Sequence, residues 1–197
     1  MKTLVLASSS PTRAQLLRSA GVAFDIVRPR VDEEEIKRQF PVGAPPAELA
    51  VALAECKAVP VARELANAMV LGADQLLVCR GAIFSKAPDL AALRQQLLDL
   101  RGSTHTLITA VALAENRSVV WRHVAEAQLT MRVFSEEFLD WYLGTEGEIL
   151  LGSVGGYRLE ALGAQWFESV SGDYFAILGL PLAPLLTALR DRGVLPA

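Results

Sequence analysis

The chain opens with a short apolar run that leads through three serines into a helical pattern. Residues 4–7 are typical of a buried strand, and Ser10 just before a proline is a start signal for a helix. The N–H groups and hydroxyls of Ser8 and Ser9 therefore face a positive helix end, and Arg13 adds a cation one turn later. This segment favours binding of a phosphate, although a well-capped helix without a ligand would have the same pattern.

Strand and helix patterns alternate along the rest of the chain. Strands are expected at 24–28, 69–73, 76–79, 106–113 and 119–133, with an acidic cluster at 31–35, and helices at 47–65, 88–100, 138–143 and 181–192. A loop at 144–156 and a hairpin at 164–178 complete the expected order. This alternation predicts an α/β fold with an elongated mixed β-sheet flanked by helices. Since neither a repeat nor a linker divides the sequence, 1–197 is expected to form a single domain.

Composition narrows the class of ligand. The net charge of −3 lacks the basic excess of a general nucleic-acid binder. The two cysteines, Cys56 and Cys79, have neither metal-ligand spacing nor the density of a disulfide framework, which favours a reducing compartment. The apolar run before Ser8 is too short for a signal peptide, and the uncharged stretch 174–189 contains two prolines and is too short to span a membrane. We therefore expect a cytoplasmic protein that binds a small molecule, and neither nucleic acid nor a membrane.

Asp74 is the residue that most suggests chemistry, because it lies between two strongly apolar runs. A buried carboxylate needs a cation, hydrogen bonds or an altered pKa, and active sites commonly provide these. Lys57, Lys86 and Arg13 could provide cations, while Glu33 and Asp74 together could hold a divalent metal. A polyphosphate would need both. Taken singly, each lysine also fits a solvated surface position, and the aspartate fits a cap or turn.

Several familiar classes of enzyme are excluded by their missing motifs. The chain has neither the G-x-x-x-x-G-K-[ST] loop of many ATPases nor the G-x-G-x-x-G turn of dehydrogenases. Ser9, His105 and Asp74 could be drawn as a hydrolase triad, but no G-x-S-x-G elbow is present. His105 is more consistent with a hydrogen-bonded structural histidine. The aromatic residues at 141–142 and 166–167 are expected mostly in the core, where one could still stack on a base.

Seven short motifs follow one another in order: Leu-Ala-Ser-Ser-Ser-Pro-Thr-Arg (6–13), Val-Asp-Glu (31–33), Leu-Ala-Glu-Cys-Lys-Ala (53–58), Gly-Ala-Asp-Gln (72–75), Ser-Lys-Ala-Pro (85–88), Leu-Arg-Gly-Ser-Thr-His-Thr (100–106) and Gly-Asp-Tyr-Phe-Ala-Ile-Leu-Gly-Leu-Pro-Leu (172–182). Together they resemble the Maf-like nucleotide pyrophosphatases over nearly the whole chain. The resemblance implies a fold similar to inosine triphosphate pyrophosphatases, with two lobes and a central cleft, usually as a homodimer. It implies hydrolysis of a nucleoside triphosphate to the monophosphate and pyrophosphate, which limits incorporation of non-standard nucleotides.

The resemblance also implies roles for particular residues. Asp74 matches a general base or metal-linked acid that activates water, and Glu33 would help to place the metal, Mg²⁺ or Mn²⁺. The polar and basic positions that would bind the phosphates are Ser8, Arg13, Lys57 and Lys86, beside Ser9 of the same turn. Thr12 stands where the family often has arginine, so one phosphate contact is expected to be missing.

Two positions resemble the branch of the family that acts on 7-methyl-GTP rather than on dTTP or UTP. They are Gln75 and Glu160, and the segment 148–157 also lacks the Asp-Lys-Ala-Gly element of the pyrimidine branch. A carboxylate such as that of Glu160 can accept both N–H groups of a guanine edge and favours a positively charged methylated ring. The alternative is an ion pair between Glu160 and Arg158 on the surface.

A second class of function stays open beside the enzyme. The family is also associated with septum formation, so the chain could be a nucleotide-binding regulator of cell division with little or no catalysis. Thr12 and the altered segment 148–157 keep this alternative open. A purely structural module would leave Asp74 unexplained.

Overall fold

The computed structural model describes residues 2–196. The strands are β1 (Thr3–Ala7), β2 (Asp25–Ile26), β3 (Ala68–Cys79), β4 (Ala82–Phe84), β5 (Thr104–Glu115), β6 (Ser118–Met131) and β7 (Phe167–Ser171). The helices are α1 (Pro11–Ser19), α2 (Glu33–Gln39), α3 (Pro46–Glu64), α4 (Leu90–Leu100), α5 (Glu136–Glu146), α6 (Tyr174–Ile177) and α7 (Leu182–Asp191), with 3₁₀ turns η1 (Gly147–Gly152) and η2 (Leu162–Trp166). Within residues 2–196, no helix is long and apolar enough to cross a membrane.

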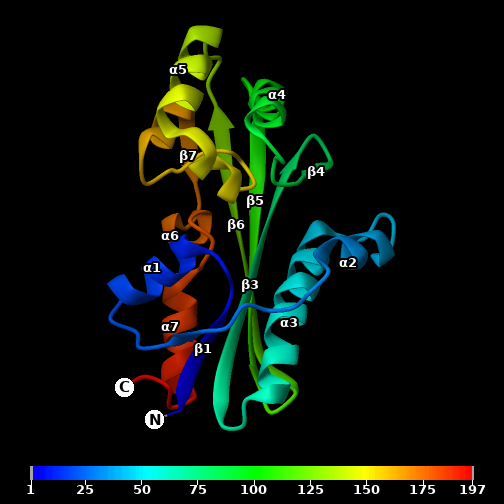
Figure 1. Cartoon of the computed structure of the whole chain (residues 1–197), viewed down its shortest axis with the longest axis vertical. Coiled ribbons are helices and arrows are strands. Elements are labelled where there is room, and N and C mark those ends of the chain that lie inside the picture. The colour runs from blue at the N-terminus through cyan, green and yellow to red at the C-terminus, as the bar shows by residue number, and fades with distance from the viewer. Residues whose placement is uncertain (1, 197) are drawn as a thin grey trace. The chain divides into compact units, whose positions relative to one another are not determined.

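All these strands belong to one sheet with the order β2-β1-β3-β5-β6-β7, and β4 pairs with β3 (Figure 1). The strand β1 runs parallel to β2 and to β3, whereas the pairs β3–β4 and β6–β7 are antiparallel. The sheet is therefore mixed and flanked by helices, which confirms the expected α/β class.

The chain divides into two compact units. Unit 1 comprises residues 1–75, 109–125 and 174–197, and unit 2 comprises 76–108 and 126–173. The strands β3, β5 and β6 each contribute residues to both units. Two units of this kind agree with the two lobes that the family resemblance implies.

Unit 1 has two apolar layers, because side chains alternate between the faces of its strands. Leu4 and Leu6 of β1 pack with α1 and α7, whereas Val5 and Ala7 pack with α3. Figure 1 shows α3 on one side of β1 and β3, with α1 and α7 on the other. The same alternation in β3 places Ala73 and Gln75 toward the α1 and α7 side, and Asp74 toward α3.

Unit 2 contains an aromatic cluster. Trp166 is fully buried and makes edge-on contacts with Phe134, Phe138 and Tyr142, whose ring centroids lie 4.5–4.8 Å from its own. Burial raises the pKa of Tyr142 to about 12. Tyr142 and Trp166 confirm the expectation of aromatic core residues, whereas Phe167 is partly buried and Trp141 is 47% exposed.

Four local expectations are wrong. The acidic cluster at 31–35 is the start of a helix, α2, in which the side chain of Asp32 accepts a hydrogen bond from the N–H of Glu35. The strand β3 continues through Asp74 rather than stopping on either side of it. The segment 144–156 contains the end of α5 and η1, and the segment 164–178 contains η2, β7 and α6 in place of a hairpin.

Candidate active site

The serine turn after β1 forms the predicted helix start. Ser10 is the N-cap of α1 and accepts a hydrogen bond from the N–H of Arg13, and a proline occupies the first helical position. Ser8 is buried, and its hydroxyl oxygen accepts hydrogen bonds from the N–H of Ser10 and from the Arg13 guanidinium. Ser9 lies exposed between them. The turn therefore presents polar groups at the positive end of a helix, as an anion site requires.

Arg13 connects this turn to two other segments of unit 1. Its Nε donates to the carbonyl of Gly179 at 2.9 Å, and its Nη1 donates to the carbonyl of Ala73 at 2.8 Å. Burial lowers the pKa of Arg13, while the nearby carboxylates of Asp74 and Glu33 act in the opposite direction. An arginine keeps its charge under such conditions, so a fixed cation lies beside Ser8 and close to both acids.

Lys57, Asp74 and Glu33 form the charged centre of unit 1. The Lys57 ammonium lies 2.6 Å from Oδ1 of Asp74 and 2.9 Å from Oε1 of Glu33. The side chains of Lys57 and Asp74 are each 9% exposed, whereas that of Glu33 is 42% exposed. One buried cation thus holds two carboxylates, and one of those carboxylates faces solvent.

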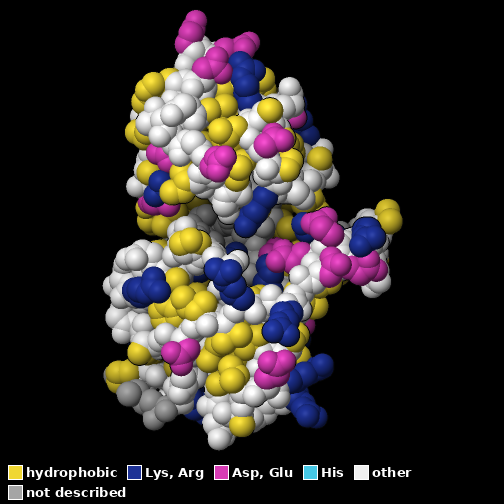
Figure 2. All heavy atoms as spheres, viewed as in Figure 1, with side chains coloured by type: hydrophobic (Ala, Val, Ile, Leu, Met, Phe, Trp, Pro, Cys, Tyr) yellow, Lys and Arg dark blue, Asp and Glu magenta, His cyan; other side chains and the backbone are white. Residues whose placement is uncertain are grey.

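Local sequence explains why these three groups meet. Lys57 follows Leu53 by four residues on the buried face of α3, so its stem points toward β3. A Cβ at Gly72 would lie 2.1 Å from the carbonyl oxygen of Ala54, which means that α3 and β3 approach closely only because residue 72 is glycine. Glu33 is the first residue of α2, where an acidic side chain is favoured by the helix dipole (Figure 2 shows acidic and basic side chains intermixed over α2).

The donor set suits a divalent metal that also binds phosphate. Within residues 2–196, no group of three or more His, Cys, Asp or Glu side chains is arranged for a metal ion. Mg²⁺ is commonly held by one or two carboxylates together with substrate phosphates and water. Asp74 and Glu33 already share one cation, so their oxygens can converge on a cation, and they are the residues that would hold such a metal.

The other predicted site residues have different surroundings. Gln75 donates its amide protons to the hydroxyl of Thr109 and to the carbonyls of Ala176 and Ile177, so it ties α6 to β3 and β5. Glu160, in unit 2, has its carboxylate 3.5 Å from Nε of Arg158. That distance fits the ion pair considered as the alternative to base recognition.

Lys86 is exposed and belongs to unit 2, whereas the charged centre lies in unit 1. The structure thus brings together Ser8, Arg13, Lys57, Asp74 and Glu33 within one unit. Sequence reasoning missed the two carbonyls, of Ala73 and Gly179, that hold Arg13. The sequence could have drawn attention to Gly179, because this residue lies in the last of the seven motifs. Its φ of +100° explains why the position is glycine.

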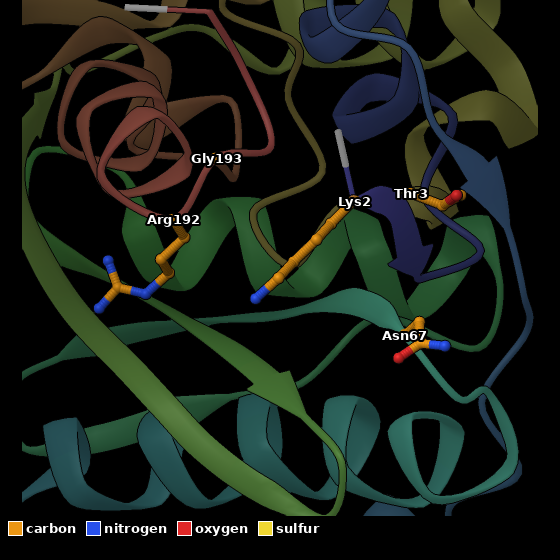
Figure 3. Close-up of a pocket in the computed structure, with 5 residues that line it drawn as sticks. All are labelled: Lys2, Thr3, Asn67, Arg192 and Gly193. Carbon is orange, nitrogen blue, oxygen red and sulfur yellow. The ribbon is translucent and has the colours of Figure 1, made fainter.

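A hollow of about 570 Å³ lies at the opposite end of β1 from the serine turn (Figure 3). Its lining includes two cations, Lys2 and Arg192, which suggest an anion at first sight. Lys2 is paired with Glu115 at 2.6 Å, and Arg192 donates to the carbonyls of Ala188 and Val120. Both cations thus help to hold the fold, and the described residues that line the hollow include no carboxylate, in contrast to the surroundings of the serine turn.

In this α/β protein a capped serine turn lies beside a buried carboxylate and two cations, a set of groups that suits a phosphate ligand. The model of the family described as "Maf-like protein" matches residues 3–192, and the chain belongs to this family. Similar curated proteins include a nucleoside triphosphate pyrophosphatase of Granulibacter bethesdensis, 50% identical over 98% of both chains. Others are a 7-methyl-GTP pyrophosphatase of Rhizobium meliloti, 44% identical over 98% of both chains, and a nucleoside triphosphate pyrophosphatase of Paramagnetospirillum magneticum, 48% identical over 97% of this chain and 99% of its own. Among solved structures, a HAM1 protein from Coxiella burnetii aligns with 66% of this chain and 73% of its own, at 16% identity and a TM-score of 0.37.

Proposed function

We propose that this protein is a nucleoside triphosphate pyrophosphatase that converts a nucleoside triphosphate to the monophosphate and pyrophosphate. The observation that carries the proposal is the buried Lys57–Asp74 pair with Glu33, next to the serine turn that Arg13 anchors. This arrangement supplies an acid for water activation and cations for polyphosphate charge. The names of the similar proteins support the same reaction, and they do not favour a regulator without catalysis.

The chemistry follows from the charges of the site. Water attacks the α-phosphorus, its oxygen forms a new bond there, and the bond from that phosphorus to the α–β bridging oxygen breaks. Asp74 accepts the proton that the water loses, and pyrophosphate leaves with the bridging oxygen. Arg13 and Lys57 stabilise the negative charge on the phosphates, with Ser8, Ser9 and Lys86 as further phosphate contacts. A divalent cation held by Asp74 and Glu33, Mg²⁺ or Mn²⁺, would neutralise phosphate charge when bound.

We also propose the domain organisation, oligomeric state and location of the enzyme. Residues 1–197 form one catalytic domain, because β3, β5 and β6 contribute residues to both units. We also propose a cytoplasmic homodimer whose partner in the reaction is a free nucleotide rather than nucleic acid or a membrane. The net charge of −3 supports the exclusion of nucleic acid.

Pyrophosphate release from a panel of dTTP, UTP, CTP, GTP and 7-methyl-GTP tests the reaction. Each nucleotide is assayed with Mg²⁺ and with Mn²⁺, beside Asp74→Asn and the exposed control Asp25→Asn. Turnover by the parent chain and by Asp25→Asn, with its loss in Asp74→Asn, is the expected result. Tight nucleotide binding without pyrophosphate release would contradict the proposal and restore the regulator.

For the substrate we propose 7-methyl-GTP or another modified nucleotide, with Gln75 and Glu160 as the base-recognition residues. Part of the support is that relatives such as the Rhizobium meliloti protein bear the name of 7-methyl-GTP pyrophosphatase. If Glu160 reads the base, Glu160→Gln lowers kcat/KM for 7-methyl-GTP more than for UTP, whereas Glu148→Gln in the same unit changes neither. An equal loss for both nucleotides would assign Glu160 to its ion pair with Arg158 instead.

A further inference from the structure

Lys57 has an unusual position for a phosphate-binding lysine. Its ammonium already contacts both carboxylates that would hold a metal, at 2.6 Å from Asp74 and 2.9 Å from Glu33. The side chain of Lys57 is 9% exposed, so the contact with Asp74 is shielded from bulk water. The ammonium therefore serves as the counter-ion of these acids.

A divalent cation would need the same carboxylate oxygens. Two cations that compete for these acids repel each other, most strongly at Asp74, because dielectric screening is weak around a carboxylate that is only 9% exposed. Within residues 2–196, no further group of acids or histidines completes a metal site at this place. Two carboxylates, the Lys57 ammonium and the nearby Arg13 guanidinium leave no net charge, which is a poor attraction for a free divalent cation.

The arrival of a triphosphate changes this balance. Its oxygens supply new ligands for the metal and a new partner for the ammonium at the same time. Lysine is suited to such an exchange, since its charge is carried at the end of a flexible four-carbon stem. Arg13 is unsuited to such an exchange of partners, because its Nε and Nη1 already donate hydrogen bonds to the carbonyls of Gly179 and Ala73.

We infer that Lys57 is an exchangeable counter-ion that blocks the metal site until a nucleotide enters. In the free protein it bridges Asp74 and Glu33, and with nucleotide it transfers to the phosphates as the metal takes its place. This inference rests on the proposed function, in which those two acids hold the metal. Its consequence is ordered loading, in which the metal enters with the nucleotide and hardly at all alone.

Binding of free Mn²⁺ to the protein without nucleotide, followed by electron paramagnetic resonance, tests the inference. The intact chain is expected to bind Mn²⁺ with a Kd of about 1 mM or weaker. Lys57→Gln, which removes the charge and keeps an N–H donor for Asp74, is expected to bind Mn²⁺ at least about tenfold more tightly. Lys57→Arg, which keeps the charge, is expected to bind as weakly as the intact chain.

A matched control removes a lysine charge elsewhere in the same region. Lys37 lies in α2, the helix that begins at Glu33, and it pairs with Glu34 rather than with the two site acids. Lys37→Gln is therefore expected to leave Mn²⁺ affinity within about twofold of the intact chain. If Lys37→Gln gained as much affinity as Lys57→Gln, the effect would reflect general charge and would overturn the inference.

Two further results would overturn it. One is a Kd of the intact chain for free Mn²⁺ in the low micromolar range. This result would overturn the inference even if Lys57→Gln fails to fold. The other is equal Mn²⁺ affinity in the intact chain and in folded Lys57→Gln. Because this measurement involves no turnover, its outcome is independent of pyrophosphate release, which tests the proposed function separately.

Discussion

The two compact units each bury a small polar group, and the two groups differ in charge. In unit 1, the ammonium of Lys57 pairs with Asp74 and Glu33. In unit 2, Nε2 of His105 lies 2.6 Å from the hydroxyl of Tyr157, and Phe167 packs against both rings. Burial lowers the pKa of His105 to about 4, so this second pair is neutral near pH 7.

This difference in charge distinguishes a candidate active site in unit 1 from a structural hydrogen-bonded pair in unit 2. A buried ion pair keeps charges that a phosphate or a metal can bind in exchange, whereas a neutral hydrogen-bonded pair within aromatic rings has little to offer a charged ligand. His105 is the structural histidine that its sequence context suggests. Altering the first group should therefore affect catalysis foremost, and altering the second should affect stability alone.

The largest effect is expected from Asp74→Asn. Loss of the proton acceptor should lower the rate of pyrophosphate release by about a thousandfold. Circular dichroism and thermal unfolding should still show a folded protein, because Lys57 retains Glu33 as its partner. Retention of more than about a tenth of the parent rate would remove Asp74 from the catalytic role.

Gly72→Ala tests the packing that brings Lys57 to Asp74. The new methyl group would lie 2.1 Å from the backbone oxygen of Ala54, so α3 must move away from β3, at a cost of about 3 kcal/mol in the free energy of unfolding. Urea unfolding measures this cost. Gly144→Ala, at an open position in α5, is the control and should be neutral or slightly stabilising. Equal effects of the two substitutions would contradict the close approach of α3 and β3.

The neutral pair predicts a pH dependence of stability. The pKa of His105 is about 4 in the folded protein, below its ordinary value of 6.5, so the folded state binds fewer protons between these values. Its contribution to stability is fully present above pH 6.5 and is lost as the pH falls through 4, by up to about 3 kcal/mol. Urea unfolding across this range should show a steeper loss in the parent chain than in His105→Gln.

The other histidine supplies the control for that measurement. His123 stacks on Trp121 in unit 1 and is not part of the buried pair. His123→Gln should keep the pH slope of the parent chain. If His105→Gln kept that slope as well, the loss of stability at low pH would have to come from other groups.

The smallest effect is expected from Tyr157→Phe. The substitution removes the hydrogen bond to His105 and leaves a buried ring nitrogen without its partner, which should cost about 1–2 kcal/mol in unfolding free energy. Tyr174→Phe changes a tyrosine that is 46% exposed and should cost much less. Pyrophosphate release should survive in Tyr157→Phe, and its loss there would contradict a purely structural role for unit 2's polar pair.

Local sequence signals predicted the serine turn and the class of fold. Ser10 and the following proline mark the start of α1 through residues adjacent in the chain, and the structure has that cap. The position of Lys57 four residues after Leu53 also carried a signal for burial, since both lie on one face of a helix. For Lys57, that spacing argues against the alternative of a solvated surface lysine.

Other features depend on distant parts of the chain. The helix α2 has no fully buried residue and hence no apolar period to reveal it, although Asp32 offered a cap signal. The strand β3 passes through Asp74 because Lys57, on another element, compensates the charge there. Two of the partners of Gln75, the carbonyls of Ala176 and Ile177, lie about a hundred residues away in the chain, so no local pattern could indicate them.

Hydrolysis in oxygen-18-labelled water, followed by phosphorus NMR of the products, tests most directly whether this site cleaves a triphosphate at its α-phosphorus. Attack at the α-phosphorus requires that the label enter the nucleoside monophosphate and that the pyrophosphate stay unlabelled. Label in the pyrophosphate, or formation of nucleoside diphosphate and inorganic phosphate, would place the attack elsewhere and contradict cleavage at the α-phosphorus.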